Sequence, residues 1–288
     1  MARIGGLIRL AHPFPSLLDG LVVGAVALVA GGDGATAVRL AVSMTALQVS
    51  IGALNDVVDS PRDAGHKPGK PIPAGLVSER FALAAVAVIG GSGVGLAMPS
   101  GWGTVALAIV VLAVGYGYDL VFKGTAWSWL PFAVGIPLLP VYGWLGAAGT
   151  LPASFAVLLP VAVVAGTALA IANARADAER DAAAGVGSVA IGLGLERAWT
   201  VNAVLLGSVV VLAFATLGSG DAALATLTSG DASLGARAGA LVAVLVIALG
   251  VLVGRHGDRA RRERAWELQA IGVGLLAMAW LAGAPLGV

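Results

Sequence analysis

The 288-residue sequence has no cysteine and little charge. Without cysteine, disulfides, thiolate metal ligands and cysteine nucleophiles are excluded. Charged residues make up 11% of the chain and hydrophobic residues 58%, and the mean hydropathy is +0.94. A soluble protein carries about 25% charged residues. We therefore predict a polytopic membrane protein, and because lipid leaves no water for backbone polar groups, an all-α one.

Several functional signatures are also missing. The sequence contains no phosphate-binding glycine loop, no dinucleotide fingerprint and no hydrolase triad pattern. Its basic residues lack the aromatic interleaving of a nucleic-acid site, so we expect no nucleic-acid partner. What the chain has in abundance is glycine, with 42 residues, which suits close packing of helices in lipid.

Apolar runs of about 18 to 21 residues are the length that crosses a bilayer as a helix. Counting such runs predicts nine transmembrane helices arranged as a bundle. The predicted spans are 14–32, 36–54, 81–99, 102–118, 127–147, 152–172, 198–217, 236–254 and 268–286.

The basic residues indicate an orientation. Of the 17 lysines and arginines, 15 lie before the first span or after an even-numbered span, and only Arg39 and Arg237 lie on the other side. Loops rich in lysine and arginine stay in the cytoplasm. We therefore expect a multi-pass protein of the cell membrane, with the N-terminus cytoplasmic and the C-terminus outside.

A polar stretch at the end of the second span is rich in carboxylates. On a helix, Asn55, Asp56, Asp59 and Asp63 share one face. Like charges that close repel each other, and a bound cation would relieve the repulsion. Oxygen ligands without thiol or imidazole favour Mg²⁺ over zinc. Taken alone, the stretch is equally compatible with a solvated acidic helix end.

A second block repeats the pattern N-x3-D-x3-D at the end of the sixth span. Asn173, Asp177 and Asp181 each lie 118 residues after their counterparts. The spacing predicts a parallel internal repeat in which helices 2 and 6 are equivalent, with both carboxylate-bearing ends on one membrane face. We interpret the chain as a single polytopic domain, 1–288, with repeats at about 1–126 and 127–254 and a last helix at about 268–286.

Basic residues surround both blocks: Arg62, Lys67, Lys70, Lys123 and Arg175. Positively charged side chains are not expected around a site that binds only a cation, whereas they are expected around a phosphate or diphosphate. Two metals that face each other across a cavity need a polyanion between them. Because the site opens from a lipid-embedded bundle, the rest of the ligand is expected to be apolar, as in an isoprenyl diphosphate.

These residues carry a resemblance. The segments NDVVDSPRD and KPGKPIPAG resemble the first aspartate-rich motif of the UbiA superfamily of intramembrane prenyltransferases, and NARADAERDAAAGVGSVAIGLG resembles the second. Tyr118 and Lys123 in YDLVFK are similar to the tyrosine and lysine of the family's fourth helix. Arg9, His12 and Pro13 stand where members often carry a basic residue and a basic-proline pair.

The resemblance implies roles for individual residues. The expected Mg²⁺ ligands are Asn55, Asp56, Asp59, Asp63, Asn173, Asp177 and Asp181. The residues expected at the substrate diphosphate are Lys67, Lys70, Lys123, Tyr118 and Arg9. The five aspartates and Lys123 would be catalytic. Two positions depart from the family pattern, because Lys70 replaces a common arginine and Ser188 a common threonine.

The implied reaction is Mg²⁺-dependent transfer of a prenyl group from an isoprenyl diphosphate to an aromatic or lipophilic acceptor, through an allylic carbocation. Two alternatives stay open: a terpene cyclase of the same superfamily that needs no acceptor, and a cation-coupled transporter.

The sequence gives less information about the residues that would bind the acceptor. The polar and aromatic side chains that would line it, or would simply face lipid, are Gln48, Tyr116, Trp127, Trp129, Phe132, Tyr142 and Trp144.

Overall fold

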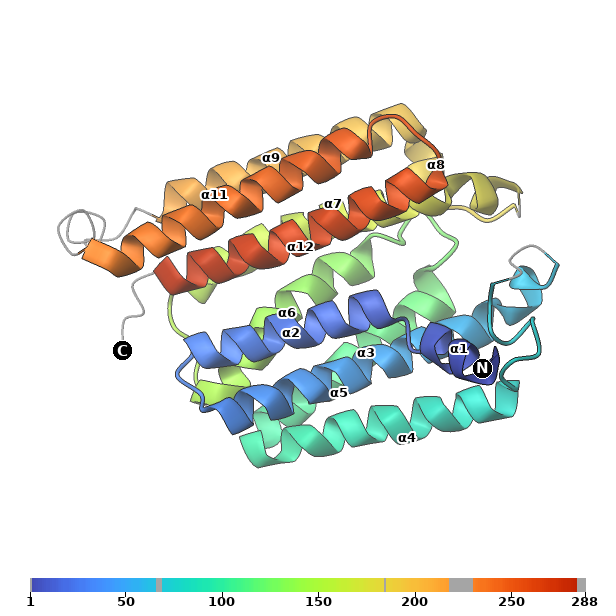
Figure 1. Cartoon of the computed structure of the whole chain (residues 1–288), viewed down its shortest axis with the longest axis horizontal. Coiled ribbons are helices and arrows are strands. Elements are labelled where there is room, and N and C mark those ends of the chain that lie inside the picture. The colour runs from blue at the N-terminus through green and yellow to red at the C-terminus, as the bar shows by residue number, and fades with distance from the viewer. Residues whose placement is uncertain (1, 66–68, 184, 218–229, 284–288) are drawn as a thin grey trace. The chain divides into compact units, whose positions relative to one another are not determined.

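The computed structural model describes residues 2–65, 69–183, 185–217 and 230–283. Every regular element within these ranges is helical, which confirms the all-α class (Figure 1). The chain divides into two compact units. Unit 1 comprises Met1–Lys123 and Leu138–Thr150, and unit 2 comprises Gly124–Pro137 and Leu151–Val288. Helix α6 (Leu130–Ala148) belongs to unit 2 in its first part and to unit 1 in its remainder.

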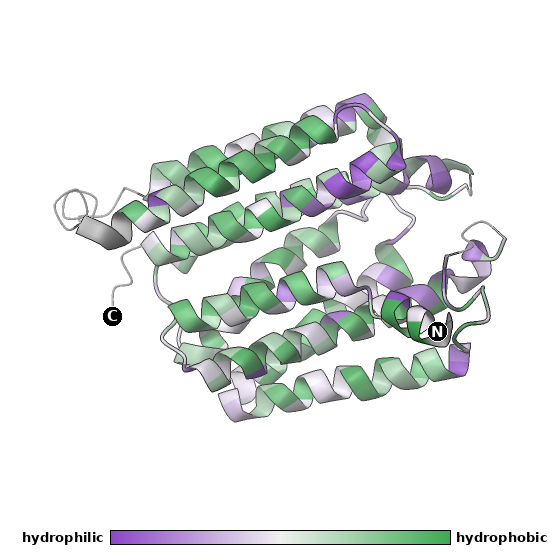
Figure 2. Cartoon of the chain, viewed as in Figure 1, coloured by the Kyte–Doolittle hydropathy of each residue, from purple (hydrophilic) through white to green (hydrophobic). Residues whose placement is uncertain are grey.

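Within the described residues, eight helices are long and apolar enough to cross a membrane, or up to nine if a bent helix pair counts as one span. That pair joins Ile4–Leu10 to Pro13–Val29 at an angle of 54°. Figure 2 shows that the long helices are hydrophobic over most of their length. The protein is therefore a multi-span membrane protein, while the count of nine spans stays a prediction.

Unit 1 is built around its longest helix, α3 (Gly34–Asp63). The other elements of this unit are α1 (Ala2–Leu10), α2 (Pro13–Val29), α4 (Glu79–Ala97), the short turn η1 (Met98–Ser100), α5 (Trp102–Gly117) and the π-helical turn η2 (Tyr118–Phe122). Close approach to α3 depends on glycine. A Cβ atom on Gly20 of α2 would lie 2.7 Å from the Ala41 carbonyl oxygen, and one on Gly115 of α5 would lie 2.3 Å from Ile51.

Two serines on α3 bond the neighbouring helices. Ser43 and Ser50 each donate a hydrogen bond to a carbonyl of α4, at 2.6 and 2.7 Å. The same hydroxyls lie 2.6 Å from the Tyr142 hydroxyl and 2.7 Å from the Tyr116 hydroxyl. Hydrogen bonds of this kind join helices where no hydrophobic force does. Tyr116 and Tyr142 thus have a packing role in unit 1.

Besides the first part of α6, the described residues of unit 2 form four long helices and one short one. Its elements are α7 (Phe155–Ala183), α8 (Val189–Leu193), α9 (Leu195–Leu217), α11 (Gly230–Val253) and α12 (Arg259–Gly283). A buried amide pair joins three of them, because Asn202 of α9 donates to the Ala168 carbonyl of α7 at 2.8 Å and to Gln269 of α12 at 3.0 Å. Such pairs fix the rotation of helices about their axes.

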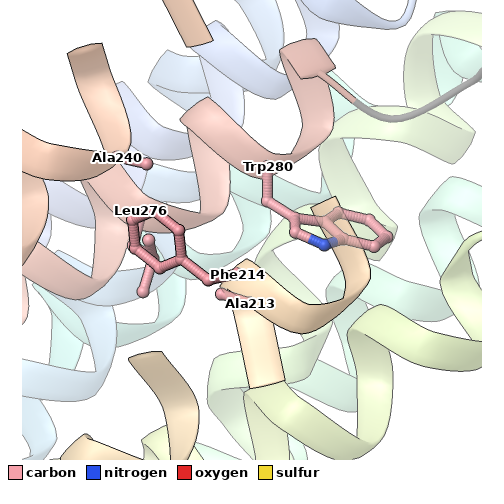
Figure 3. Close-up of a pocket in the computed structure, with 5 residues that line it drawn as sticks. All are labelled: Ala213, Phe214, Ala240, Leu276 and Trp280. Carbon is pink, nitrogen blue, oxygen red and sulfur yellow. The ribbon is translucent and has the colours of Figure 1, made fainter. Parts of the chain in front are cut away.

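Unit 2 also contains a small apolar pocket (Figure 3). Its walls are Ala213, Phe214, Ala240, Leu276 and Trp280. No titratable side chain lines it. Leu276 lies about 25 Å along α12 from the charged start of that helix, given the rise of about 1.5 Å per residue. The pocket therefore lies far from the acidic motif of this unit.

Three helices extend beyond the spans predicted from hydropathy by nine residues or more. Helix α3 continues past residue 54 to Asp63, α7 continues past 172 to Ala183, and α12 begins at Arg259 instead of 268. The added turns are polar, so a rule based on apolar runs stops too early, whereas helices continue where their polar ends reach water or ionic partners. The short helices α1 and α8 were not predicted. The internal repeat and the single-domain assignment stay predictions.

Candidate active site

The first acidic motif occupies the last turns of α3. Asp56, Asp59 and Asp63 are only 1%, 5% and 3% exposed. Burying a carboxylate is costly unless a cation or several donors accompany it. The surroundings of this helix end must therefore supply positive charge.

Two lysines supply it. The Lys70 amine, from the segment after α3, donates to Asp56 Oδ1, and the Lys123 amine donates to Asp59 Oδ2 at 2.5 Å. Asp56 Oδ1 also accepts from His12 Nε2 at 3.0 Å. The other oxygen, Asp56 Oδ2, is buried and has no hydrogen-bond partner in the described part of the chain. This carboxylate thus has two donors on one oxygen and an open coordination position on the other.

The junction of α1 and α2 brings His12 to Asp56. His12 has a φ of 45°, a left-handed conformation that is uncommon for a residue other than glycine. Gly52 of α3 leaves room for its ring, because a Cβ there would lie 2.9 Å from His12 Cγ. Arg9 donates to the Gly69 carbonyl at 3.0 Å, next to Lys70. Helix α1 therefore fixes the segment that carries Lys70.

The turn η2 brings two more side chains to α3. Asp119 is 4% exposed and accepts a hydrogen bond of 2.6 Å from Asn55 Nδ2. Lys123 follows this turn, and its amine lies 5.8 Å from the Tyr118 ring centroid. Sequence reasoning selected Tyr118 and Lys123 but missed Asp119. A single acid beside Tyr118 in an otherwise apolar run was the available signal.

The second acidic motif lies at the end of α7, in unit 2. Asp177 is 41% exposed, and its Oδ1 accepts from Arg259 Nε of α12 at 3.1 Å, with Arg180 at 3.9 Å. Asn173 and Asp181 are half-buried. Figure 2 shows the first turns of α12 in the hydrophilic colour. Arg259, at the start of α12, thus contacts the second motif directly.

Neighbouring ion pairs hold α12 against this motif. Arg262 donates to both oxygens of Glu179, at 2.5 Å each, and to the Gly257 carbonyl at 2.8 Å. Arg175, which was expected near the ligand, is 4% exposed and donates to the Leu195 carbonyl at 3.1 Å. Glu179, Arg259 and Arg262 were missed as site residues because their pairing depends on α12 reaching back to α7.

In unit 1 the structure brings together most residues predicted for it: Arg9, Asn55, Asp56, Asp59, Asp63, Lys70, Tyr118 and Lys123. Lys67 lies outside the described residues. Among the described residues, no group of three or more Asp, Glu or His side chains is arranged so that it could hold a metal ion. In unit 1, lysine amines pair with the Asp56 and Asp59 carboxylates.

The fold and these polar helix ends define a helical membrane protein with two aspartate motifs. Comparison with known proteins specifies the class. Residues 20–282 match the UbiA prenyltransferase family, and the chain belongs to this family.

One relative is the digeranylgeranylglyceryl phosphate synthase of Natronomonas pharaonis, 35% identical over 126 residues. The match covers 43% of this chain and 46% of the relative, so the chain spans about half the length of this curated relative.

Solved structures agree in fold. A UbiA homologue from Aeropyrum pernix K1 has a TM-score of 0.71 at 18% identity, covering 91% of this chain and 96% of that one. A homologue from Archaeoglobus fulgidus bound to GPP and Mg²⁺ has a TM-score of 0.69 at 17% identity, covering 96% and 99%.

Proposed function

We propose that this protein transfers a prenyl group from an isoprenyl diphosphate to a lipophilic acceptor, with Mg²⁺ as cofactor. The observation that carries the proposal is the pairing of buried aspartates with lysines at the end of α3. Asp56 binds Lys70, and Asp59 binds Lys123. Such a site offers carboxylates to a metal and ammonium groups to a diphosphate, which together are what a metal-bound diphosphate requires.

The donor set fits Mg²⁺. It consists of carboxylate and amide oxygens, and Asp56 Oδ2 is a buried oxygen without a hydrogen-bond donor in the described part of the chain. The residues that would hold the metal are Asn55, Asp56, Asp59 and Asp63 in the first motif and Asn173, Asp177 and Asp181 in the second. Bound Mg²⁺ would neutralise negative charge on the departing diphosphate. Homologues from Archaeoglobus fulgidus were solved with DMAPP or GPP and Mg²⁺.

The chain's own cations then complete the site. With Mg²⁺ bound by the carboxylates, the Lys70 and Lys123 amines would be free of Asp56 and Asp59 and could donate to diphosphate oxygens. Arg9, Lys67 and Tyr118 are the further candidates for this ligand. Lysine suits the exchange because it is a compact charge on a flexible stem. In the second motif, Arg259 would play the same part beside Asp177.

The proposed reaction breaks the bond between the first prenyl carbon and the diphosphate oxygen, and the electron pair leaves with the diphosphate. The allylic cation is attacked by the acceptor, which loses a proton. Cationic donors at the departing oxygens lower the barrier because they stabilise the negative charge that develops there. The relative from Natronomonas pharaonis is named for a glyceryl phosphate product. This name favours a hydroxyl-bearing lipid over an aromatic ring as the acceptor.

We further propose that both motifs lie on the cytoplasmic side of the cell membrane. The distribution of basic residues supports this orientation. Within unit 1, Arg39 lies 17 residues before Asp56 on α3, about 25 Å along the helix axis. Of the 17 lysines and arginines, only Arg39 and Arg237 are predicted to lie on the membrane side opposite the motifs.

The test is product analysis with purified protein in lipid nanodiscs. Geranylgeranyl diphosphate and Mg²⁺ are supplied with glyceryl lipids, with aromatic acceptors or with no acceptor. Release of diphosphate together with a prenylated lipid is the expected result. A cyclic hydrocarbon or alcohol formed without acceptor would instead identify a terpene cyclase. Absence of diphosphate release from several prenyl diphosphates would contradict the proposal and favour the transporter.

A further inference from the structure

Asp119 is a buried acid to which the proposed reaction assigns no role. It is the only acidic residue between Glu79 and Asp177 in the sequence, and it lies in the π-helical turn η2. Its Oδ2 atom is buried without a hydrogen-bond partner in the described part of the chain. A carboxylate at this depth costs free energy, and π-helical turns inside helices are frequent at functional sites.

The contact of Asp119 with Asn55 fixes the orientation of an amide. A carboxylate only accepts hydrogen bonds, so the Asn55 NH₂ group must point to Asp119 Oδ1, at 2.6 Å. The Asn55 carbonyl oxygen then points to the other side of the amide. An asparagine without such a partner can present either its nitrogen or its oxygen, and only the oxygen binds a metal cation.

The geometry of η2 brings a matched pair of side chains to α3. Asp119 contacts Asn55, and Lys123, four residues later, contacts Asp59, which is four residues after Asn55. The Lys123 backbone N–H donates to the Tyr118 carbonyl at 2.8 Å, the five-residue spacing of a π turn. The two contacts therefore form a ladder between η2 and the helix end that carries the first motif.

We propose that Asp119 is a positioning residue that holds the Asn55 carbonyl oxygen toward the Mg²⁺ of a prenyl diphosphate complex. The proposal rests on the proposed function. Asp119 acts through Asn55, in the way that outer-shell partners orient metal ligands. Removing such a partner typically weakens metal affinity about 10–100-fold.

The experiment measures Mg²⁺ binding without turnover. Geranyl S-thiolodiphosphate, an unreactive analogue, is held constant while Mg²⁺ is titrated, and the midpoint of the rise in melting temperature is recorded. Asp119→Leu should raise the Mg²⁺ midpoint about 10–100-fold. Asp119→Asn keeps an acceptor oxygen for Asn55 and should raise the midpoint far less.

A second experiment exchanges the amide and the carboxylate between positions 55 and 119. Asn55→Asp places two carboxylates face to face and should bind Mg²⁺ poorly. Adding Asp119→Asn to it restores a donor–acceptor pair with the amide on η2, and should recover most of the affinity. A double variant no better than Asn55→Asp would overturn the proposal.

Ser50→Ala is the matched control, because it removes a different buried hydrogen bond between α3 and its neighbours. It should lower the melting temperature without Mg²⁺ and leave the Mg²⁺ midpoint unchanged. If it moved the midpoint as much as Asp119→Leu, the role of Asp119 would be structural only. If the wild-type protein showed no Mg²⁺-dependent binding of the analogue, the proposed function itself would fail. Wild-type binding with an unchanged midpoint in Asp119→Leu would reject the positioning role alone.

Discussion

The two acidic motifs have the same spacing but different surroundings. In unit 1, the three carboxylates at the end of α3 are almost fully buried, and two of them bind lysines from segments outside the helix. In unit 2, Asp177 is half-exposed, and its partner is an arginine of α12. The same sequence pattern is therefore buried in unit 1 and half-exposed in unit 2.

This difference determines how strongly each motif is coupled to the fold. A buried charge without its partner destabilises a protein by several kcal/mol, whereas an exposed ion pair contributes about 0–1 kcal/mol. The first motif should therefore affect both stability and ligand binding. The second should affect ligand binding with little effect on stability.

The largest effects are expected for the aspartates themselves. Asp59→Ala and Asp177→Ala should both reduce diphosphate release to background, because each removes a proposed metal ligand. They should differ in stability. Asp59→Ala leaves the Lys123 amine without its carboxylate and should cost about 1–3 kcal/mol, whereas Asp177→Ala should cost less than about 0.5 kcal/mol. Turnover near the wild-type value in either variant would refute the proposed role of that aspartate as a metal ligand.

The cations should show the same contrast in stability. Lys123→Ala leaves Asp59 buried without its ammonium partner and should destabilise the protein by about 3 kcal/mol. Added Mg²⁺ should recover part of this loss, since the metal replaces the missing charge. Arg259→Ala should cost less than about 1 kcal/mol and respond little to Mg²⁺. Melting curves with and without Mg²⁺ measure both effects, and equal losses would contradict the comparison.

Asp33 is an exposed carboxylate, and its substitution should have the smallest effect on stability. It caps α3 by accepting from the Thr36 backbone N–H at 2.7 Å, and this hydrogen bond lowers the pKa of its carboxyl below the ordinary value of 3.8. Because the pKa is depressed in the folded state, the charged cap stabilises fully above pH 3.8, and the contribution is lost as the pH falls through the lower folded pKa.

The measurement is the melting temperature of Asp33→Ala and of the wild type as a function of pH. The difference should be constant near neutral pH and should shrink below pH 3.8. It should stay smaller than the effect of Asp59→Ala at every pH. A difference that grew on acidification would contradict this account of the cap.

Much of the fold could be predicted from local sequence. Each apolar run that was predicted to span the membrane overlaps a helix of the structure, because a helix in lipid needs a continuous apolar stretch. Residues 284–286 of the last predicted span lie outside the described residues. The spacing of Asp56, Asp59 and Asp63 placed them on one helix face, and the structure buries all three. The resemblance to UbiA prenyltransferases is confirmed by the family match. The predicted repeat and the facing motifs remain predictions.

The partners of the site residues were less accessible to sequence reasoning. Asp119 contacts Asn55 across 64 residues of sequence, and only the π turn directs it there. Arg259 and Arg262 reach residues of α7 more than 80 positions earlier. Arg175, a basic residue inside the second motif, binds a backbone carbonyl. No local pattern distinguishes these outcomes, because each depends on where two distant helices meet.

The sequence by itself determined the class of protein, the approximate positions of its long helices and the residues of both acidic motifs. These properties follow from hydropathy and from the helical repeat, which act over a few turns of chain. Only the tertiary structure decided which cations pair with Asp56, Asp59 and Asp177, which amide contacts Asp119, and how deeply each motif is buried. Those choices depend on the packing of helices far apart in sequence, and burial determines how much each charge pair contributes.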